Sequence, residues 1–220
     1  MSNDDLWMRL VSQICVRGSA RGMDAVTGSR GTKDSFIQAI SLHDWQKRNL
    51  DEEYFSDILK RFKATRFHNE AARSLRKIAK CETAIRGGKV VLLAELDQCS
   101  ANSALQREHI LKRCPVLGWK SVSDFMIETG VSDDVIALDT RIVKLLQKHF
   151  GYNVPVGRVQ SSEALYMSLE NALREACAEV KVPLALLDRL LFRLSGMSVI
   201  DFFMKYGAAG LEFNAASISE

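Results

Sequence analysis

The chain has few of the features that mark secreted, membrane or metal-cluster proteins. Its five cysteines are scattered over 220 residues without a CxxC pair. Such a set is typical of reduced thiols, and it excludes a zinc ribbon or an iron–sulfur cluster built on closely spaced cysteines. No apolar run approaches the roughly 18 residues of a membrane span. The start, MSNDDLWMRL, is acidic where a secretory signal would be basic, so we expect an intracellular protein without membrane attachment.

Proline is also scarce, and helical patterns fill the space between the three prolines. Pro115, Pro155 and Pro183 each stand where a helix should begin or break. Apolar residues recur at helical spacing in most of the remaining chain. The predicted helices cover residues 4–16, 36–40, 54–62, 71–87, 89–96, 103–113, 119–129, 140–150, 161–180, 184–195 and 199–206.

Two segments are harder to assign. The Gly- and Ser-rich residues 18–35 indicate an irregular connection. The segment KVVLLAEL, residues 89–96, has the composition of a short strand. We favour a helix there, because the chain offers no evident partner strand. The predicted fold class is therefore all-α.

A helical hairpin is the first specific signal. In ILKRCPVLGWKSVSDFMIETG, Pro115 ends one helix and Gly118 permits a close backbone approach before the next helix begins. The free N–H groups at a helix N-terminus bind phosphate, so this turn could grip DNA of any sequence. An ordinary αα-hairpin is an equally good interpretation of the spacing alone.

Residues 60–80, KRFKATRFHNEAARSLRKIAK, are dense in lysine and arginine, with Glu70 as the only acid. They could face phosphates, although a solvated helix face explains most charge runs. The net charge of +3 is by itself weak evidence for a nucleic-acid partner.

Lys120 and Asp139 are the candidates for chemistry. Lys120 falls in the first turn of the second hairpin helix, where the helix dipole and partial burial would lower the pKa of its amine. A lysine with a lowered pKa can form a Schiff base with a sugar carbon. Asp139 follows the apolar run VIAL, which suggests a carboxylate at the rim of a cleft. The alternatives are a surface lysine and a plain helix N-cap, and as neighbours the two would titrate as a coupled pair.

The chain resembles a known superfamily at these residues. CPVLGWK, followed about twenty residues later by ALDTRIV, is similar to the LPGVGxK and VD-type signature of the helix-hairpin-helix base-excision DNA glycosylases. The segment from Gly118 to Leu146 looks most like the archaeal and bacterial 8-oxoguanine glycosylases of the second type. RLVSQICVRGSA, KATRFHNEAARSLRKIA and LLDRLLF are similar to other helices of that group. Three departures are Val116 for the first hairpin glycine, Arg141 for histidine and Phe192 for tryptophan.

The resemblance implies a bifunctional DNA glycosylase and lyase of base excision repair, with 8-oxoguanine as the favoured base. Lys120 would be the nucleophile and Asp139 the essential carboxylate. Gln13 would fill the gap left by the flipped base, and Asp188 and Phe192 would line the base pocket. The residues expected to contact double-stranded DNA are Gln13, Arg17, Val116, Leu117, Gly118 and Trp119.

The resemblance also carries expectations about architecture and cofactors. Residues 1–30 and 151–220 would form one helical lobe, and residues 31–150 the other, with the hairpin at about 103–130 and the active site in a cleft between lobes. No organic cofactor, catalytic metal or iron–sulfur cluster is expected, although hairpin carbonyls could hold a monovalent cation. We expect a monomer.

Two other functions remain open. The chain could be a monofunctional glycosylase that removes alkylated or mismatched bases with Asp139 and an activated water, Lys120 being incidental. It could also be a non-catalytic helix-hairpin-helix module that only binds DNA.

Overall fold

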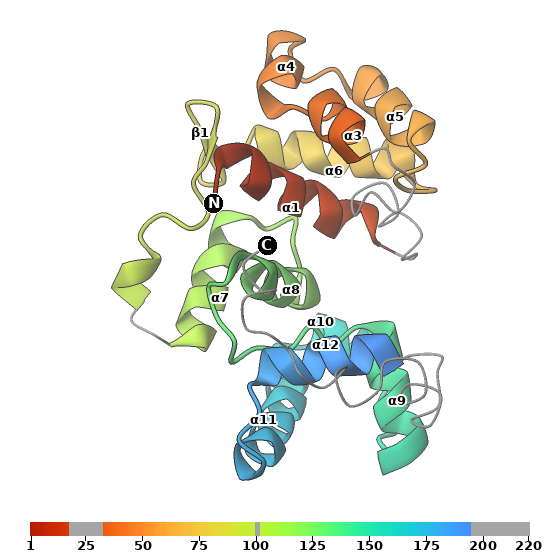
Figure 1. Cartoon of the computed structure of the whole chain (residues 1–220), viewed down its shortest axis with the longest axis vertical. Helices are drawn as coiled ribbons and strands as arrows, with labels where there is room; N and C mark the ends of the chain where they lie inside the picture. The colour runs from red at the N-terminus through yellow and green to blue at the C-terminus, as the bar shows by residue number, and fades with distance from the viewer. Residues whose placement is uncertain (18–32, 100–101, 195–220) are drawn as a thin grey trace. The chain divides into compact units, whose positions relative to one another are not determined.

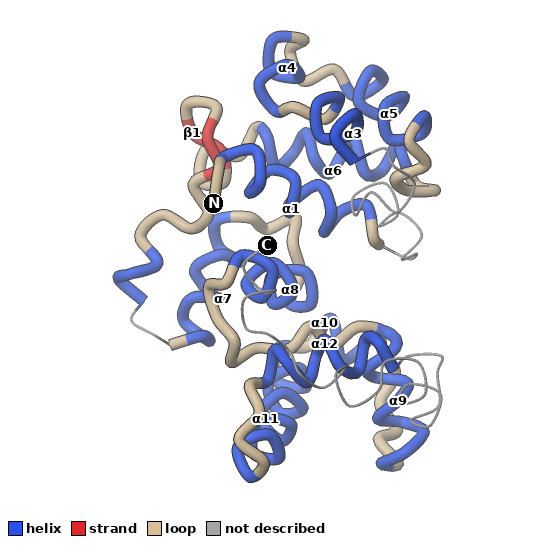
Figure 2. Tube along the Cα trace, in the orientation of Figure 1, coloured by secondary structure: helices blue, strands red, loops and turns tan. Residues whose placement is uncertain are grey.

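The computed structural model describes residues 1–17, 33–99 and 102–194, and in these residues the chain is helical almost throughout (Figures 1 and 2). The all-α prediction is confirmed. The chain divides into two units, Met1–Leu117 and Gly118–Glu220, and the boundary falls inside the hairpin turn. None of the helices described is long and apolar enough to cross a membrane.

The first unit is built around an aromatic cluster. Trp45 and Phe55 stack with ring centroids 4.0 Å apart, and Trp7 lies 6.1 Å from Trp45. Each indole N–H donates to a backbone carbonyl at 2.7 Å, that of Trp7 to Ile40 and that of Trp45 to Asp51. The elements of this unit are α1 (Asn3–Cys15), α3 (Lys33–Ala39), α4 (Leu42–Lys47), α5 (Glu52–Arg61), α6 (His68–Ala79), β1 (Ile85–Arg86), β2 (Lys89–Val90), the 3₁₀ helix η2 (Leu96–Cys99) and α7 (Ser103–Arg113).

The prediction for residues 71–96 was wrong in two places. Helix α6 ends at Ala79, and residues 89–96 form no α-helix. Instead β1 and β2 pair as an antiparallel hairpin around Gly87 and Gly88. Both glycines have positive φ, of 56° and 77°, which a tight hairpin turn requires at its two central positions. The Gly-Gly pair was thus a hairpin signal, and the missing partner strand lay just before it.

The second unit contains α8 (Trp119–Thr129), α9 (Thr140–Phe150), α10 (Val156–Ser161), α11 (Glu163–Glu179) and α12 (Leu184–Leu194). The bounds of α8 and α9 match the prediction to the residue. Gly130 and Gly151 end these helices with φ of 69° and 66°, the left-handed conformation that favours glycine. The short helices α4 and α10 were not predicted, and the predicted helix 199–206 lies outside the described residues.

The units differ from the lobes expected from the sequence. That division grouped residues 1–30 with 151–220, whereas the most extensive contacts of α1 within the first unit are with α6 and β2. Asn3 accepts a hydrogen bond from the Val90 N–H at 2.8 Å, which ties the start of α1 to the β-hairpin. The lobe assignment stays a prediction.

A buried, non-helical segment crosses the core of the second unit. Residues Val135 to Leu138 are at most 4% exposed, yet they belong to neither a helix nor a strand. Buried peptide groups need hydrogen-bond partners. Side chains supply them: Glu170 accepts from Ile136 N at 3.2 Å, and Asp188 accepts from Ala137 N at 2.8 Å.

Tyr166 on α11 binds the backbone of residues 135–138 at two points. Its hydroxyl donates to the Ile136 carbonyl at 2.6 Å and accepts from Leu138 N at 3.1 Å. Gln160 completes the set by donating to the Leu138 carbonyl at 3.0 Å. The path of the chain into residue 139 is therefore fixed by side chains of α10, α11 and α12.

Replacing Tyr166 with phenylalanine should lower the free energy of unfolding by about 2–3 kcal/mol, because it leaves a buried carbonyl and a buried N–H without their partner. Urea denaturation measures this loss. Tyr54→Phe is the matched control, since the Tyr54 ring contact with Arg48 survives and the change should stay within about 0.5 kcal/mol. Equal stabilities of the Tyr166 variant and the wild type would contradict the role assigned to the hydroxyl.

Candidate active site

The hairpin turn has the local geometry for binding a phosphate. Leu117 N donates to the Cys114 carbonyl at 3.0 Å, and α8 begins at Gly118 without a side-chain cap. The first N–H groups of α8 therefore have no acceptor within the helix. A Cβ on Gly118 would meet no atom of the described residues within 4 Å, so these residues leave space for a ligand at this position. The φ of Gly118, −95°, suits any residue, so the turn itself does not require glycine.

Two other positions expected at the DNA lie on or just after α1. The Arg17 guanidinium donates to the Val116 carbonyl at 2.8 Å, which connects it to the hairpin turn within the first unit. Val116 has no positive φ, so the turn tolerates valine where the resembling family has glycine. Gln13 is only 1% exposed, and it would have to become accessible to fill a gap in a duplex.

The basic stretch 60–80 is partly neutralised. Arg76 pairs with Glu52 at 2.8 Å, and Arg73 approaches the same carboxylate at 3.9 Å. All of its other lysines and arginines are exposed. A phosphate-facing surface on α5 and α6 stays a prediction.

Lys120, the expected nucleophile, lies in a polar network of the second unit. Its Nζ donates to Asp124 Oδ2 at 2.8 Å, one turn along α8. The other oxygen of Asp124 is 3.3 Å from Arg189 Nη1, and that nitrogen is 3.6 Å from Asp188 Oδ2. All these side chains are at most one-third exposed, and Asp188 is 4% exposed. The carboxylate in contact with Lys120 is thus Asp124.

The same network leads to the segment before Asp139. Asp188 pins Ala137 N through its Oδ1, and Asp139 N turns back to the Ala137 carbonyl at 2.6 Å. Asp139 follows Ala137 by two residues, so their Cα atoms are at most about 7 Å apart. The structure therefore places Lys120, Asp139 and Asp188 in one unit, joined through Asp124 and Arg189.

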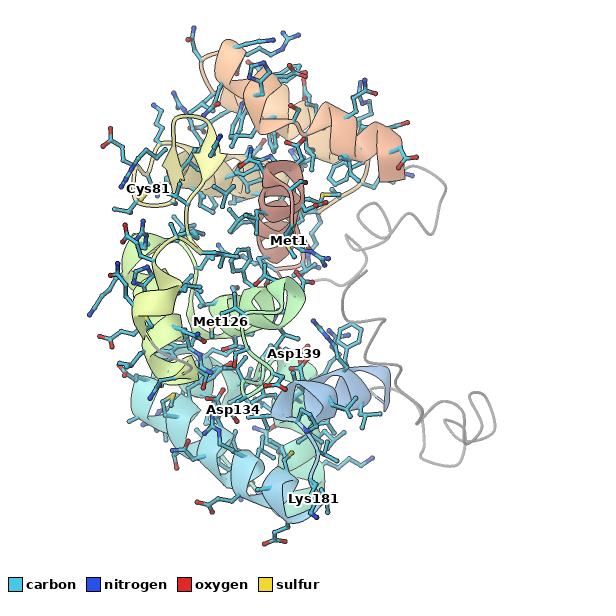
Figure 3. All side chains as sticks on the ribbon, turned by 60° about the vertical axis from the view of Figure 1, so that its left-hand side comes forward. Met1, Cys81, Met126, Asp134, Asp139 and Lys181 are labelled. Atoms are coloured by element: carbon cyan, nitrogen blue, oxygen red, sulfur yellow. The ribbon has the colours of Figure 1, made fainter. Side chains whose placement is uncertain are left out.

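Both oxygens of Asp139 have partners (Figure 3 labels this residue). Oδ1 caps α9 by accepting from Arg141 N at 2.8 Å and Ile142 N at 2.9 Å. Oδ2 accepts from Nε and Nη2 of the Arg141 side chain at 2.9 and 2.8 Å. The guanidinium carbon in turn lies 3.9 Å from the centre of the Phe192 ring. A positive charge is thus held between a carboxylate and an aromatic face, both of which attract cations.

Asp188 has an unusual titration. Burial raises the pKa of its carboxyl to about 6, and the nearby Asp124 also raises it. Arg189, the Ala137 N–H and Lys120 act in the opposite direction. Burial dominates because a charged carboxylate loses its hydration inside the protein.

Two pockets of about 210 Å³ in the described residues lie elsewhere, and none of the predicted site residues lines either of them. One is bordered by α1, α3 and α4, and the other by Arg174, Cys177 and Pro183. Within the same residues, no group of three or more His, Cys, Asp or Glu side chains could hold a metal ion.

The described residues are mostly helical, and they include a hairpin helix without a side-chain cap and a lysine and an aspartate joined by one polar network. These are the parts of a helix-hairpin-helix DNA glycosylase. The comparison with protein families agrees, because the Ogg-HhH model, 8-oxoguanine DNA glycosylase, matches residues 33–182. The chain belongs to this family, and it is accordingly a DNA glycosylase of base excision repair that acts on DNA. No match was found among the curated proteins or the solved structures.

Three residues of the candidate site were not singled out as functional from the sequence. Asp124 had a readable signal, because a carboxylate four residues after Lys120 lies on the same face of the helix. Arg141 was noted only as a departure from the family pattern. Arg189 had no signal, since its contact with Asp124 depends on how α12 packs.

The Asp188 carboxyl should make the protein less stable as the pH rises. Its folded pKa of about 6 lies above the ordinary value of 3.8, so the folded state binds this proton more tightly. That contribution is complete below about pH 4 and is lost as the pH passes 6; two pKa units correspond to about 3 kcal/mol. Asp188→Asn should remove this slope, so the variant should gain on the wild type between pH 4 and 7.

Urea denaturation at several pH values tests this. Asp57→Asn, an exposed position on α5, is the control for a simple change in net charge. Parallel pH profiles for wild type and Asp188→Asn would contradict the assignment.

Proposed function

We propose that the chain is a bifunctional enzyme, which excises 8-oxoguanine from double-stranded DNA and then cuts the strand through a Schiff base on Lys120. The single observation that carries the proposal is the network joining the Lys120 amine to the segment that ends at Asp139. Family membership supports the glycosylase step and the oxidised base.

The hairpin supplies the grip on the backbone. A phosphate accepts hydrogen bonds from the N–H groups at the start of α8, and the missing Cβ of Gly118 lets it approach. Such contacts carry no sequence information, and binding weakens as salt increases. The target nucleotide is rotated out of the stack, at a cost of a few kcal/mol.

Asp139 stabilises the positive charge that develops on the sugar. Its Oδ1 is fixed by the N-cap, so Oδ2 is the oxygen that can face the sugar. Arg141 occupies that oxygen and covers one face of Phe192, so the arriving nucleotide displaces its guanidinium. The freed ring can then stack on the flipped base.

Lys120 completes the reaction. Its amine, once it has lost a proton, attacks C1′ as the bond to the base breaks. Opening of the sugar ring gives a Schiff base, and elimination of the 3′ phosphate leaves a nicked strand. Asp188 anchors the Ala137 backbone and helps to hold Arg189, so it supports the positions of Asp139 and Asp124.

No organic cofactor or metal enters this mechanism. The monovalent cation at the hairpin stays a prediction. The Val116 carbonyl already accepts the Arg17 guanidinium and the Cys114 carbonyl accepts Leu117 N, so a cation would compete with these donors. A monomeric state and an intracellular location also stay predictions.

Lys120→Gln should abolish the covalent complex that borohydride traps on 8-oxoguanine duplexes. Asp139→Asn should slow single-turnover excision at least 100-fold, because it removes the charge while asparagine still caps α9. Lys144→Gln, an exposed position on α9, is the control. Excision without trapping by the wild type would instead indicate the monofunctional glycosylase, and salt-sensitive binding without excision of any lesion would indicate a binding module.

Gly118→Ala should weaken DNA binding while it leaves the stability of the fold nearly unchanged. An added Cβ meets no atom in the part of the chain that the structure describes, so the cost in unfolding free energy should stay below about 1 kcal/mol. Loss of a phosphate contact should weaken binding to duplex DNA about tenfold. Gly157→Ala in α10 also adds a Cβ in open space and should leave the affinity unchanged. Wild-type affinity of the Gly118 variant would exclude the hairpin as the phosphate site.

A further inference from the structure

The Lys120–Asp124 ion pair differs from an ordinary helical pair by its burial. Its side chains are 22% and 14% exposed. Lys112 and Glu108 on α7 form a pair at the same separation in sequence, with 73% and 52% exposure. In a solvated pair of that kind, water competes for both charged groups, so the pair contributes little to the stability of the protein. The buried pair excludes most of that water, so Asp124 is the nearest proton acceptor for the Lys120 amine.

Asp124 is also held from its other side. Arg189 on α12 contacts Oδ1 of Asp124 at 3.3 Å and the Asp188 carboxylate at 3.6 Å. The charged groups that face Asp124 include Lys120 on its own helix and Arg189 and Asp188 on α12. Arg189 keeps Asp124 in place when the Lys120 amine moves towards a substrate, so the carboxylate need not follow the lysine.

We propose that Asp124 is a general base that receives the Lys120 proton and so turns the ammonium into the attacking amine. This inference rests on the proposed function of Lys120. One proton moves from Lys120 Nζ to Asp124 Oδ2. The nitrogen lone pair then forms a bond to C1′ as the bond from C1′ to the base breaks, and its electron pair leaves with the base.

Two further proton transfers follow, one to the departing base and one to O4′. The new secondary ammonium gives one proton to the departing base, which leaves neutral. When the C1′–O4′ bond breaks to form the protonated Schiff base, O4′ takes the proton held by Asp124. After these steps Asp124 is ionised again, as it was before the reaction.

Asp124→Asn is the decisive variant, because the amide can accept a hydrogen bond from Lys120 but cannot take its proton. Borohydride trapping at neutral pH should fall about 100-fold, within the usual range for a lost general base. The trapping rate should then rise tenfold per pH unit as hydroxide takes over, while the wild-type rate levels off. The dissociation constant for DNA should stay within twofold. Glu108→Gln, which breaks the solvated pair, should match the wild type throughout.

An abasic-site duplex separates this role from that of Asp139. The aldehyde of an abasic site has no base to expel, yet the amine must still lose its proton. Asp124→Asn should therefore impair trapping on both substrates, whereas Asp139→Asn should impair it mainly on the 8-oxoguanine duplex.

Wild-type trapping with an unchanged pH profile in Asp124→Asn would overturn the inference. Asp124→Glu and Asp124→Gln repeat the comparison with a longer side chain, should the asparagine variant fail to fold. Glutamate should restore trapping and glutamine should not, and equal trapping by the two would equally overturn it. Failure of the proposed function would show separately, as the absence of any trapped complex with the wild type.

Discussion

The position of Asp139 depends on one constraint, which is that the buried peptide groups of residues 135–138 must find partners without a neighbouring strand. Glu170, Tyr166 and Asp188 provide those partners from helices α11 and α12. An unpaired buried peptide group costs about 1–3 kcal/mol, so sliding this segment would break several bonds at once. The start of α9, and with it the carboxylate that caps it, is consequently held by the core rather than by the surface.

Asp188 links this scaffold to the polar network of Lys120. One of its oxygens binds the Ala137 N–H, and the other lies near Arg189. Burying a carboxylate is costly, as the raised pKa of Asp188 indicates. Removing one partner from a buried charge cluster generally costs more than the cluster gains overall. The contribution of Asp188 is therefore structural rather than energetic. One side chain fixes both the backbone at Ala137 and the Arg189 guanidinium.

Features of the fold and the site that are set by nearby residues could be predicted from the sequence, whereas those set by tertiary packing could not. The bounds of α8 and α9 were readable because Gly118, Gly130, Asp139 and Gly151 are local cap signals. The β-hairpin was missed because Gly87–Gly88 also suits the end of a helix. In the site, Lys120, Asp139 and Asp188 were chosen from the sequence and lie in one unit. The contacts that join them depend on the packing of α12 against the core, which no local pattern encodes.

Arg141 gives the free protein a different electrostatic state from the one that the proposed mechanism requires. Its guanidinium neutralises Asp139 and rests on Phe192, so two groups suited to a cation are already satisfied. Under the proposed function, the nucleotide must displace this arginine before either group can act on the sugar or the base. A phosphate is a natural new partner for a displaced guanidinium, because it offers bidentate, charge-assisted bonds. Binding of DNA would then expose the carboxylate only when a backbone is present to hold the arginine, which couples the grip on DNA to the chemistry.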